Sequence, residues 1–103
     1  MNTRILKKKN CLITGATGGI GEEISKQLAT LSCNLFLTST NKTKLEKLKK
    51  NLRKINTSIS IETFPVNLDS EENVLELIKH VRKKFASINI LINCAGIFMI
   101  KSI

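Results

Sequence analysis

A glycine-rich stretch at residues 14–21 carries the residues best suited to chemistry in this 103-residue chain. Its sequence is Thr-Gly-Ala-Thr-Gly-Gly-Ile-Gly, and it follows an apolar segment and precedes a helix-like pattern. Glycine permits a positive φ and leaves room for a ligand close to the backbone. The free N–H groups and the positive dipole end of the following helix would face that ligand. The stretch therefore predicts a site for the phosphates of a cofactor.

Each glycine of this stretch has an expected task. Gly15 would allow a sharp exit from the preceding strand, because glycine adopts a positive φ at little cost. Gly18 and Gly19 would let a pyrophosphate approach the backbone, and Gly21 would let the helix lie close to the sheet. The stretch lacks the Lys-Ser/Thr ending of a P-loop, which disfavours a nucleoside-triphosphate hydrolase. A turn with a purely structural role is the alternative.

Apolar patterns that alternate between strand-like and helix-like segments are expected to position this stretch. Segments at residues 10–14, 34–38, 59–65 and 88–93 have the apolar or alternating character of strands. Three helix faces separate them, with apolar residues three or four positions apart. The residues of these faces are Ile20, Ile24, Leu28 and Leu31; Leu45, Leu48, Leu52 and Ile55; and Val74, Leu77, Ile78, Val81 and Phe85.

The β-α-β-α-β-α-β pattern predicts an α/β fold of the Rossmann type, a doubly wound parallel sheet with helices on both faces. We expect the strand order 3-2-1-4, with the strand before the glycines in the centre. The strand that ends at Pro65 then lies at an edge, where a missing N–H is tolerated. Asp69 and Glu72 have the spacing of a capping box, so Asp69 is expected to cap the third helix. The apolar residues 90–92 are expected to be buried on both faces of the sheet.

The net charge of +9 could indicate a nucleic-acid partner, but the residue types argue against one. Fourteen of the 17 basic residues are lysine, whereas arginine is the residue that recognises phosphates and bases with a fork of donors. The four phenylalanines lie inside apolar segments and not among the lysines, so they form no stacking platform. We therefore expect no nucleic-acid partner, and we interpret the lysine-rich helix face of residues 42–54 as a solvated surface.

The length of the apolar runs and the number and spacing of the cysteines indicate the cellular compartment of the protein. The longest apolar run, residues 95–100, is far shorter than the roughly 20 residues that cross a bilayer. The cysteines, Cys11, Cys33 and Cys94, are odd in number and have no metal-binding spacing. We expect a cytoplasmic protein with reduced thiols, no membrane partner and no metal site. His80 is expected to be a helix residue without a catalytic role.

Two motifs together resemble the short-chain dehydrogenase/reductase family. The first is the T-G-x-x-x-G-I-G pattern of residues 14–21, and the second is Asn-Cys-Ala-Gly at residues 93–96. The glycines also fit the T-G-x-x-G-x-x-G of a longer, epimerase-like branch, but the second motif differs from the sequence of that branch. The chain looks most like the 3-oxoacyl-[acyl-carrier-protein] reductase type, to which residues 39–41 and 67–68 are similar.

The resemblance implies a cofactor-binding role for residues at the carboxyl ends of all four strands. Residues 15–21 would hold the pyrophosphate and the adenosine ribose, and Thr40 would lie near that ribose or its 2′-phosphate. Asn67 would pair with the adenine edge, and residues 95–96 would line the nicotinamide side. The implied cofactor-binding residues are Gly15, Ala16, Thr17, Gly18, Gly19, Ile20, Gly21, Ser39, Thr40, Asn67, Leu68, Asn93, Cys94, Ala95 and Gly96.

The end of the second strand favours one form of the cofactor. A preference for NAD(H) usually needs a carboxylate there, which holds the ribose 2′-OH. Residues 37–41 offer none, and their hydroxyl groups together with Lys42 would tolerate a 2′-phosphate. The sequence therefore predicts NADP(H) in preference to NAD(H). Cys94 stands where asparagine is commoner in the family, so its side chain is not expected to contact the cofactor.

The family's reaction requires residues that this chain does not contain. Hydride transfer between a nicotinamide and a carbonyl or alcohol uses a Ser, a Tyr and a Lys, and the chain has no tyrosine. We interpret residues 1–103 as the dinucleotide-binding, N-terminal portion of a longer NAD(P)-dependent oxidoreductase, with no catalytic residue and no activity alone.

The longer protein would be a homo-oligomer that acts on a small-molecule carbonyl or on a substrate bound to acyl-carrier protein. Two alternatives belong to other classes of protein. One is a non-catalytic nucleotide-binding module that is complete at 103 residues, and the other is a basic nucleic-acid-binding protein that reuses the fold.

Overall fold

Four parallel strands form one sheet in the order β3-β2-β1-β4, which confirms the predicted order. The computed structural model describes residues 3–94. Its strands are β1 (Asn10–Thr14), β2 (Asn34–Ser39), β3 (Ile61–Pro65) and β4 (Ile90–Asn93). A short 3₁₀ helix, η1 (Thr3–Leu6), precedes β1, and α1 (Gly19–Thr30), α2 (Lys42–Ile55) and α3 (Glu71–Lys84) connect the strands in turn. Pro65 ends the edge strand β3, as its missing N–H predicts.

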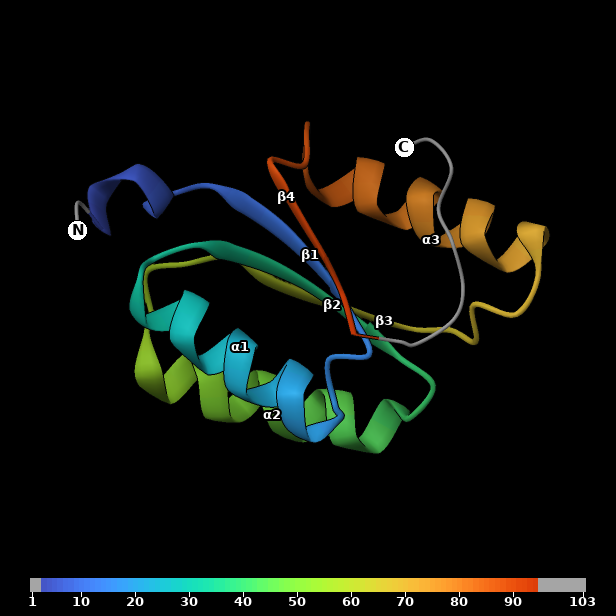
Figure 1. Cartoon of the computed structure of the whole chain (residues 1–103), viewed down its shortest axis with the longest axis horizontal. Coiled ribbons are helices and arrows are strands. Elements are labelled where there is room, and N and C mark those ends of the chain that lie inside the picture. Colours follow the sequence, from blue (N-terminus) through green and yellow to red (C-terminus); the bar gives the residue numbers. More distant parts are fainter. Residues whose placement is uncertain (1–2, 95–103) are drawn as a thin grey trace.

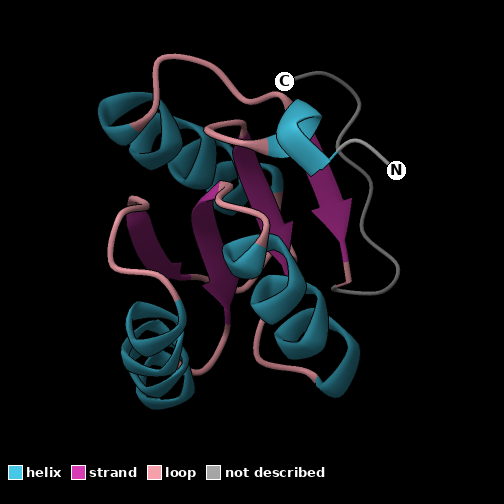
Figure 2. Ribbon diagram, turned by 90° about the vertical axis from the view of Figure 1, so that its left-hand side faces the viewer, coloured by secondary structure: helices cyan, strands magenta, loops and turns pink. Residues whose placement is uncertain are grey.

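The helices form one layer on each face of the sheet. Figure 1 shows α1 and α2 side by side on one face and α3 on the other, and Figure 2 shows the strands between these layers. Alternate residues of β1 therefore enter different cores: Ile13 packs with the α1–α2 layer, and Leu12 packs with Leu77 and Val81 of α3. The two central strands, β1 and β2, are buried along most of their length, as their continuous apolar sequence predicts.

The buried face of α1 differs from the predicted one. Ile20 was expected on that face, but its side chain is 74% exposed. Leu28 of the predicted face is buried and Ile24 packs against the same core, whereas the other buried residues of α1 are small: Gly21, Ser25 and Ala29. A Cβ on Gly21 would overlap the carbonyl oxygen of Gly15 and lie 2.9 Å from Cα of Ala16. The start of α1 thus lies so close to the glycine loop that glycine is the residue that fits.

The cap of α3 is also different from the expected one. Asp69 was expected to cap this helix, but the N-cap residue is Ser70, whose hydroxyl oxygen accepts a hydrogen bond of 3.2 Å from the N–H of Asn73. Ser70 is the cap because α3 begins at Glu71, whereas a cap at Asp69 would require the helix to begin at Ser70. In α2, Asn41 has the same role and accepts from the N–H of Lys44 at 2.9 Å.

The strand β4 begins at Ile90, two residues later than predicted, and it is less buried than expected. Ile90 and Ile92 pack against the core beneath α1 and α2, but Leu91, on the α3 face, is 39% exposed. The expectation that residues 90–92 are buried on both faces is therefore wrong for this structure. Within residues 3–94, the longest helices have 14 residues, and none is long and apolar enough to cross a membrane.

Candidate functional site

A groove of about 610 Å³ lies at the carboxyl ends of the strands. In an open parallel sheet, ligands bind in the crevice at this edge, where the strand order reverses. Here the reversal lies between β1 and β4, because the chain runs from β1 outward to β3 and then returns to the other side of β1. The residues that line the groove are Gly15, Thr17, Gly18, Thr38, Ser39, Thr40, Val66, Asn67, Leu68, Asp69 and Cys94.

The glycine loop between β1 and α1 forms one wall of the groove. Gly15 has a φ of 64°, which confirms the expected use of glycine for the exit from β1. The N–H of Ala16 donates to the carbonyl oxygen of Thr38 at 3.1 Å, and the N–H of Gly18 donates to that of Gly15 at 3.2 Å. These bonds fix the loop against the end of β2 and direct the chain into α1.

The three glycines that follow in the loop differ in what a side chain would meet. A Cβ on Gly19 has no atom within 4 Å, and a Cβ on Gly18 has its nearest neighbour, the carbonyl oxygen of Gly15, at an ordinary 3.5 Å. Gly21, by contrast, has no room for a Cβ. The structure of the chain itself therefore requires glycine at position 21 but not at position 19, where the space lies open at the start of α1.

The N-terminus of α1 is not capped by a side chain, unlike those of α2 and α3. Its N-cap residue, Gly18, makes no side-chain hydrogen bond. The first N–H groups of a helix have no partner within the helix, and together with the helix dipole they favour a negative charge. Because Gly18 also lines the groove, these N–H groups are available to an anion bound there.

The ends of β2 and β3 form the other wall. The hydroxyl group of Thr38, a residue that the sequence analysis missed, is buried and donates to the carbonyl oxygen of Phe64 at 2.7 Å. Ser39 accepts from the N–H of Asn41 at 3.1 Å, which bends the chain away from the sheet. Thr40 is exposed at the mouth of the groove. None of these three lining residues carries a charge.

Two further residues that the sequence analysis missed line the groove beside Asn67 and Leu68. Val66 is bound to β2 through a 2.9 Å hydrogen bond from its N–H to the carbonyl oxygen of Ser39. Asp69 had been interpreted as a cap, and it is the one charged side chain among the lining residues that the structure describes. Its place two residues after Asn67 in the sequence was the available signal.

The end of β4 closes the groove on the other side of β1. Thr14 donates to Oδ1 of Asn93 at 2.8 Å, and the N–H of Cys94 donates to the carbonyl oxygen of Thr14 at 3.0 Å. Asn93 therefore supports the groove without being among its lining residues, whereas Cys94 lines it. The expected contributions of Ala95 and Gly96 lie outside the described residues.

Several expected site residues lie near the groove but not in its lining. Ala16 is fully buried beneath the loop, and Gly21 is buried against it. Gly19 and Ile20 are exposed at the first turn of α1. The structure thus brings together Gly15, Thr17, Gly18, Ser39, Thr40, Asn67, Leu68 and Cys94 of the expected set.

A smaller groove of about 230 Å³ adjoins the first one. It lies between the start of α1 and the first turns of α2, and Thr17 lines both grooves. Two lysines, Lys44 and Lys47, also line it, together with Glu22, Leu48 and Asn51. Glu22 is paired with Lys26 at 3.2 Å on the surface of α1. The two lysines place positive charge in the groove that shares Thr17 with the large one.

The buried cysteines are structural. Burial, together with a smaller effect of the neighbouring Cys33, raises the pKa of Cys11 to about 12. Burial also raises the pKa of Cys33, whose thiol donates to the carbonyl oxygen of Leu6 at 3.3 Å. Such thiols stay protonated and do not act as nucleophiles near neutral pH. No group of histidine, cysteine or acidic residues within residues 3–94 is arranged to hold a metal ion.

Known proteins resemble this chain in sequence and in fold. An uncharacterised oxidoreductase of Staphylococcus saprophyticus is 33% identical over 98 residues, which are 95% of this chain and 42% of that protein. The very-long-chain 3-oxoacyl-CoA reductase of Vanderwaltozyma polyspora is 41% identical over 87 residues, which are 84% of this chain and 24% of that protein. The structure of L-sorbose reductase from Gluconobacter frateurii, in complex with NADPH and L-sorbose, covers 100% of this chain with a TM-score of 0.86.

That reductase is 24% identical to this chain, which covers 38% of it, so the likeness shows a shared fold. The chain thus spans less than half the length of each of these three proteins. The sequence profile described as short chain dehydrogenase matches residues 9–103, which include the glycine loop, all four strands and the Asn-Cys-Ala-Gly motif. The chain therefore belongs to the short chain dehydrogenase family.

Proposed function

We propose that this chain binds a nicotinamide dinucleotide and serves an oxidoreductase that transfers hydride between that cofactor and a carbonyl or alcohol. The observation that carries the proposal is the uncapped start of α1, which faces a groove at the switch point of the sheet. The open space at Gly19 adds to it, because a phosphate group can approach the backbone there. The residues present therefore fit the pyrophosphate of a dinucleotide.

The strand order suggests how the cofactor lies in the groove. The pyrophosphate would meet the N–H groups at the start of α1, above β1. The adenosine would extend toward Ser39, Thr40 and Asn67 at the ends of β2 and β3, and the nicotinamide toward Cys94 at the end of β4. When bound, the cofactor supplies or accepts the hydride. The chain's own residues would bind and orient it.

We also propose a preference for NADP(H). No carboxylate lies at the end of β2, where one would bind the ribose 2′-OH of NAD(H). Lys44 and Lys47 line the adjoining small groove and would face a 2′-phosphate across Thr17. A titration of the chain with both cofactors tests this preference, and tighter binding of NADH than of NADPH would overturn it.

Proton transfer is not assigned to any residue of this chain. The chain has no tyrosine, and no lysine or histidine lines the described part of the groove. We propose that these residues form the cofactor-binding part of a longer reductase, which agrees with the 42% of the staphylococcal relative that the chain covers. The Vanderwaltozyma relative suggests a 3-oxoacyl thioester as the substrate class.

A non-catalytic nucleotide-binding module is the second candidate, and the absence of tyrosine is the observation that favours it. The genomic DNA that follows codon 103 distinguishes the two. A continuing reading frame that encodes Tyr-x-x-x-Lys supports the oxidoreductase, and unrelated sequence supports the module. Binding itself is tested by the fluorescence of NADPH, since the chain has no tryptophan or tyrosine to interfere. A saturable rise in NADPH fluorescence supports both candidates, and no change contradicts both.

A further inference from the structure

Helix α2 carries most of the net positive charge of the chain. Its 14 residues include seven basic side chains and one acidic side chain, a net charge of +6 in a chain whose net charge is +9. Helix α3 has the same length but carries four basic and three acidic side chains. The excess of positive charge is therefore a property of the exposed surface of α2 and not of the helices in general.

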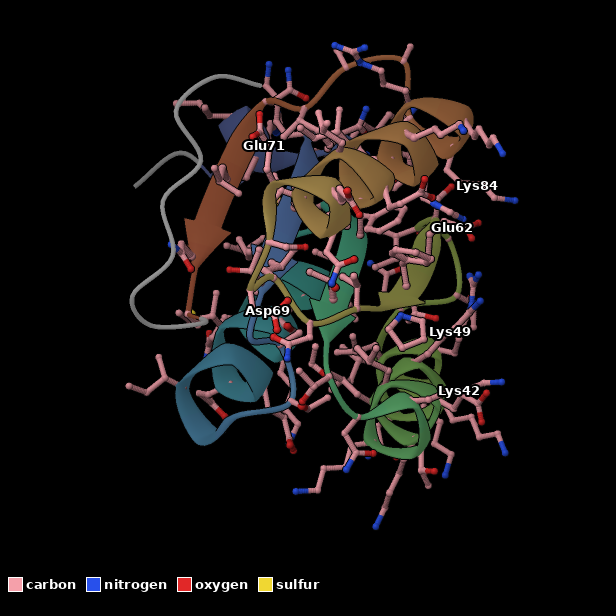
Figure 3. All side chains as sticks on the ribbon, turned by 90° about the vertical axis from the view of Figure 1, so that its right-hand side faces the viewer. Lys42, Lys49, Glu62, Asp69, Glu71 and Lys84 are labelled. Carbon is pink, nitrogen blue, oxygen red and sulfur yellow. The ribbon has the colours of Figure 1, made fainter. Side chains whose placement is uncertain are left out.

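A shallow groove of about 530 Å³ lies on this exposed surface of α2. Its lining residues, which we call the α2 patch, are Glu46, Lys49, Lys50, Arg53 and Lys54. None of them lines the large groove or the small groove that adjoins it. Figure 3 shows Lys42 and Lys49 on α2 well apart from Asp69, which lines the large groove. The α2 patch is thus a separate surface, for which the proposed function gives no role.

The cations of the α2 patch are not neutralised by the part of the chain that the structure describes. Within residues 3–94, no carboxylate oxygen lies within 4.0 Å of any of these cations, whereas Lys26 and Glu22 on α1 form an ion pair. The four cations form two rows along the helix, because Lys49 precedes Arg53, and Lys50 precedes Lys54, by four residues. Like charges at this spacing repel one another, and an anionic partner would relieve that repulsion.

Arg53 is already ordered for such a partner. Its Nη1 donates to the carbonyl oxygen of Ile59 at 2.8 Å, just before β3 begins. A guanidinium group has five N–H donors in a planar fork, so the remaining donors of Arg53 can pair with both oxygens of a carboxylate. Because the contact with Ile59 restricts the side chain before a partner binds, less conformational entropy is lost on binding.

The residues of the α2 patch favour an acidic protein over a nucleic acid or a membrane. No aromatic side chain lies on α2, so the bases of a nucleic acid have nothing on which to stack. The patch contains no apolar side chain that could insert into a lipid surface, because the leucines of α2 are buried in the core. Glu46 would repel a phosphate backbone, which has only acceptors, but it can accept hydrogen bonds from the backbone N–H groups of a peptide.

We propose that the α2 patch is a docking surface for an acidic segment of another protein. The carboxylates of that segment pair with the four cations, and its backbone N–H groups donate to Glu46. On an extended segment, side chains that point to one face are about 7 Å apart, close to the rise of about 6 Å between residues four apart on a helix. Both rows of the patch can therefore be paired. The proposal does not depend on the proposed function, because the surface lies outside both grooves.

The test measures the binding of fluorescein-labelled deca-glutamate to the full chain by fluorescence anisotropy. The salt concentration is about 0.15 M, at which attraction between distant charges is screened. An oligothymidylate with the same number of charges and vesicles that contain phosphatidylserine are the alternative polyanions. We expect deca-glutamate to bind at least about threefold more tightly than the oligothymidylate, the range for one additional hydrogen bond, here to Glu46.

Substitutions locate the binding surface, and the folding of each variant is checked by circular dichroism. The double substitution of Lys50→Glu and Lys54→Glu should weaken peptide binding at least about tenfold, because two attractions become repulsions. The matched control is Lys79→Glu with Lys83→Glu, which reverses two exposed lysines of the same spacing on α3, on the other face of the sheet. This control changes the net charge equally and should weaken binding by no more than about threefold. Glu46→Gln should strengthen the binding of the oligothymidylate more than that of the peptide.

Three results would overturn the proposal. The first is no saturable binding of deca-glutamate, or an equal loss in the two double variants, because the attraction would then depend on net charge alone. The second is tighter binding of the oligothymidylate or of the vesicles than of the peptide, which would assign the patch to another class of partner. The third concerns NADPH: the variant with Lys50→Glu and Lys54→Glu should bind it within about twofold of the unmodified chain, and a tenfold loss would make the patch part of the cofactor site.

Discussion

The hydroxyl group of Thr14 donates a 2.8 Å hydrogen bond to Oδ1 of Asn93, and this bond joins the ends of β1 and β4, the two parallel strands between which the strand order reverses. Thr14 is the last residue of β1 and Asn93 the last of β4, and the two are register partners. The glycine loop begins immediately after one of them, and Cys94 in the groove follows the other. The bond therefore fixes the distance between the two halves of the candidate site.

We predict that Thr14→Val destabilises the fold and loosens the end of β4. Valine has the same shape as threonine but cannot donate to Asn93, and the loss of one hydrogen bond costs about 1 kcal/mol in the free energy of unfolding. Urea denaturation of the chain measures this cost. Thr30→Val is the matched control, because Thr30 is exposed and bonds only within its own helix, and it should change the stability by about 0.5 kcal/mol or less. Equal effects of the two substitutions would contradict the role given to Thr14.

Gly19→Ala and Gly21→Ala should separate binding from folding. At position 21 the new methyl group would overlap the backbone of Gly15, so we expect a loss of several kcal/mol of stability, or failure to fold. At position 19 the methyl group meets no atom of the chain, so stability should be unchanged or raised by up to about 1 kcal/mol. The affinity for NADPH should nevertheless fall at least about tenfold, because the methyl group enters the space proposed for the pyrophosphate. A Gly19→Ala variant that binds NADPH normally would contradict this assignment.

The stability of the chain should fall above pH 9 in a way that depends on Cys11. Burial raises the pKa of this thiol from 9.0 to about 12, so between these values the folded state keeps a proton that the unfolded state releases. The contribution of the Cys11 thiol to the stability of the fold is therefore fully present below pH 9 and is lost as the pH rises toward 12. The difference in stability between the unmodified chain and Cys11→Ala should therefore narrow over this range, by up to about 1.4 kcal/mol per pH unit. A difference in stability that stays constant between pH 9 and pH 12 would contradict the burial of the thiol. The control variant Cys94→Ala leaves Cys11 in place, so its stability should fall over this range as that of the unmodified chain does.

Cysteine modification should report directly on the groove. Cys94 lines the groove and is partly exposed, whereas Cys11 and Cys33 are fully buried. We predict that iodoacetamide labels Cys94 first in the folded chain, and that saturating NADPH slows this reaction because the bound cofactor occupies the groove through which the reagent reaches the thiol. Mass spectrometry of the labelled peptides measures both effects. Labelling of Cys33 at the same rate as Cys94, or no protection by NADPH, would contradict this arrangement.

The strand order and the position of the groove could be predicted because they depend on patterns that extend over whole segments. Continuous apolar strands require a sheet covered on both faces, and a right-handed crossover then leaves few orders for four parallel strands. The glycine loop, with its positive φ at Gly15, was recognisable because few residues other than glycine adopt that backbone conformation. These features follow from the kinds of residue alone.

The details that were missed depend on distances that a pattern does not contain. Ile20 belongs to the apolar spacing of α1, but the close approach of the helix to Gly15 places Gly21 on the buried face and leaves Ile20 exposed. Asp69 has the residue type of a cap, yet α3 begins one residue later and Ser70 takes that role. Because Asp69 was assigned to the helix, its place in the groove was overlooked.

The most direct test of the proposed site is a map of the backbone amides that respond to NADPH. The chain is labelled with ¹⁵N, and its NMR spectrum is recorded at increasing NADPH concentration. We predict that the amide signals of Gly15, Gly18 and Gly19 shift and saturate together with those of Asn67 and Asp69. Changes confined to the lysine-rich surface of α2, at Lys49 and Lys50, would mean that NADPH binds by charge alone, and they would contradict the groove as the cofactor site.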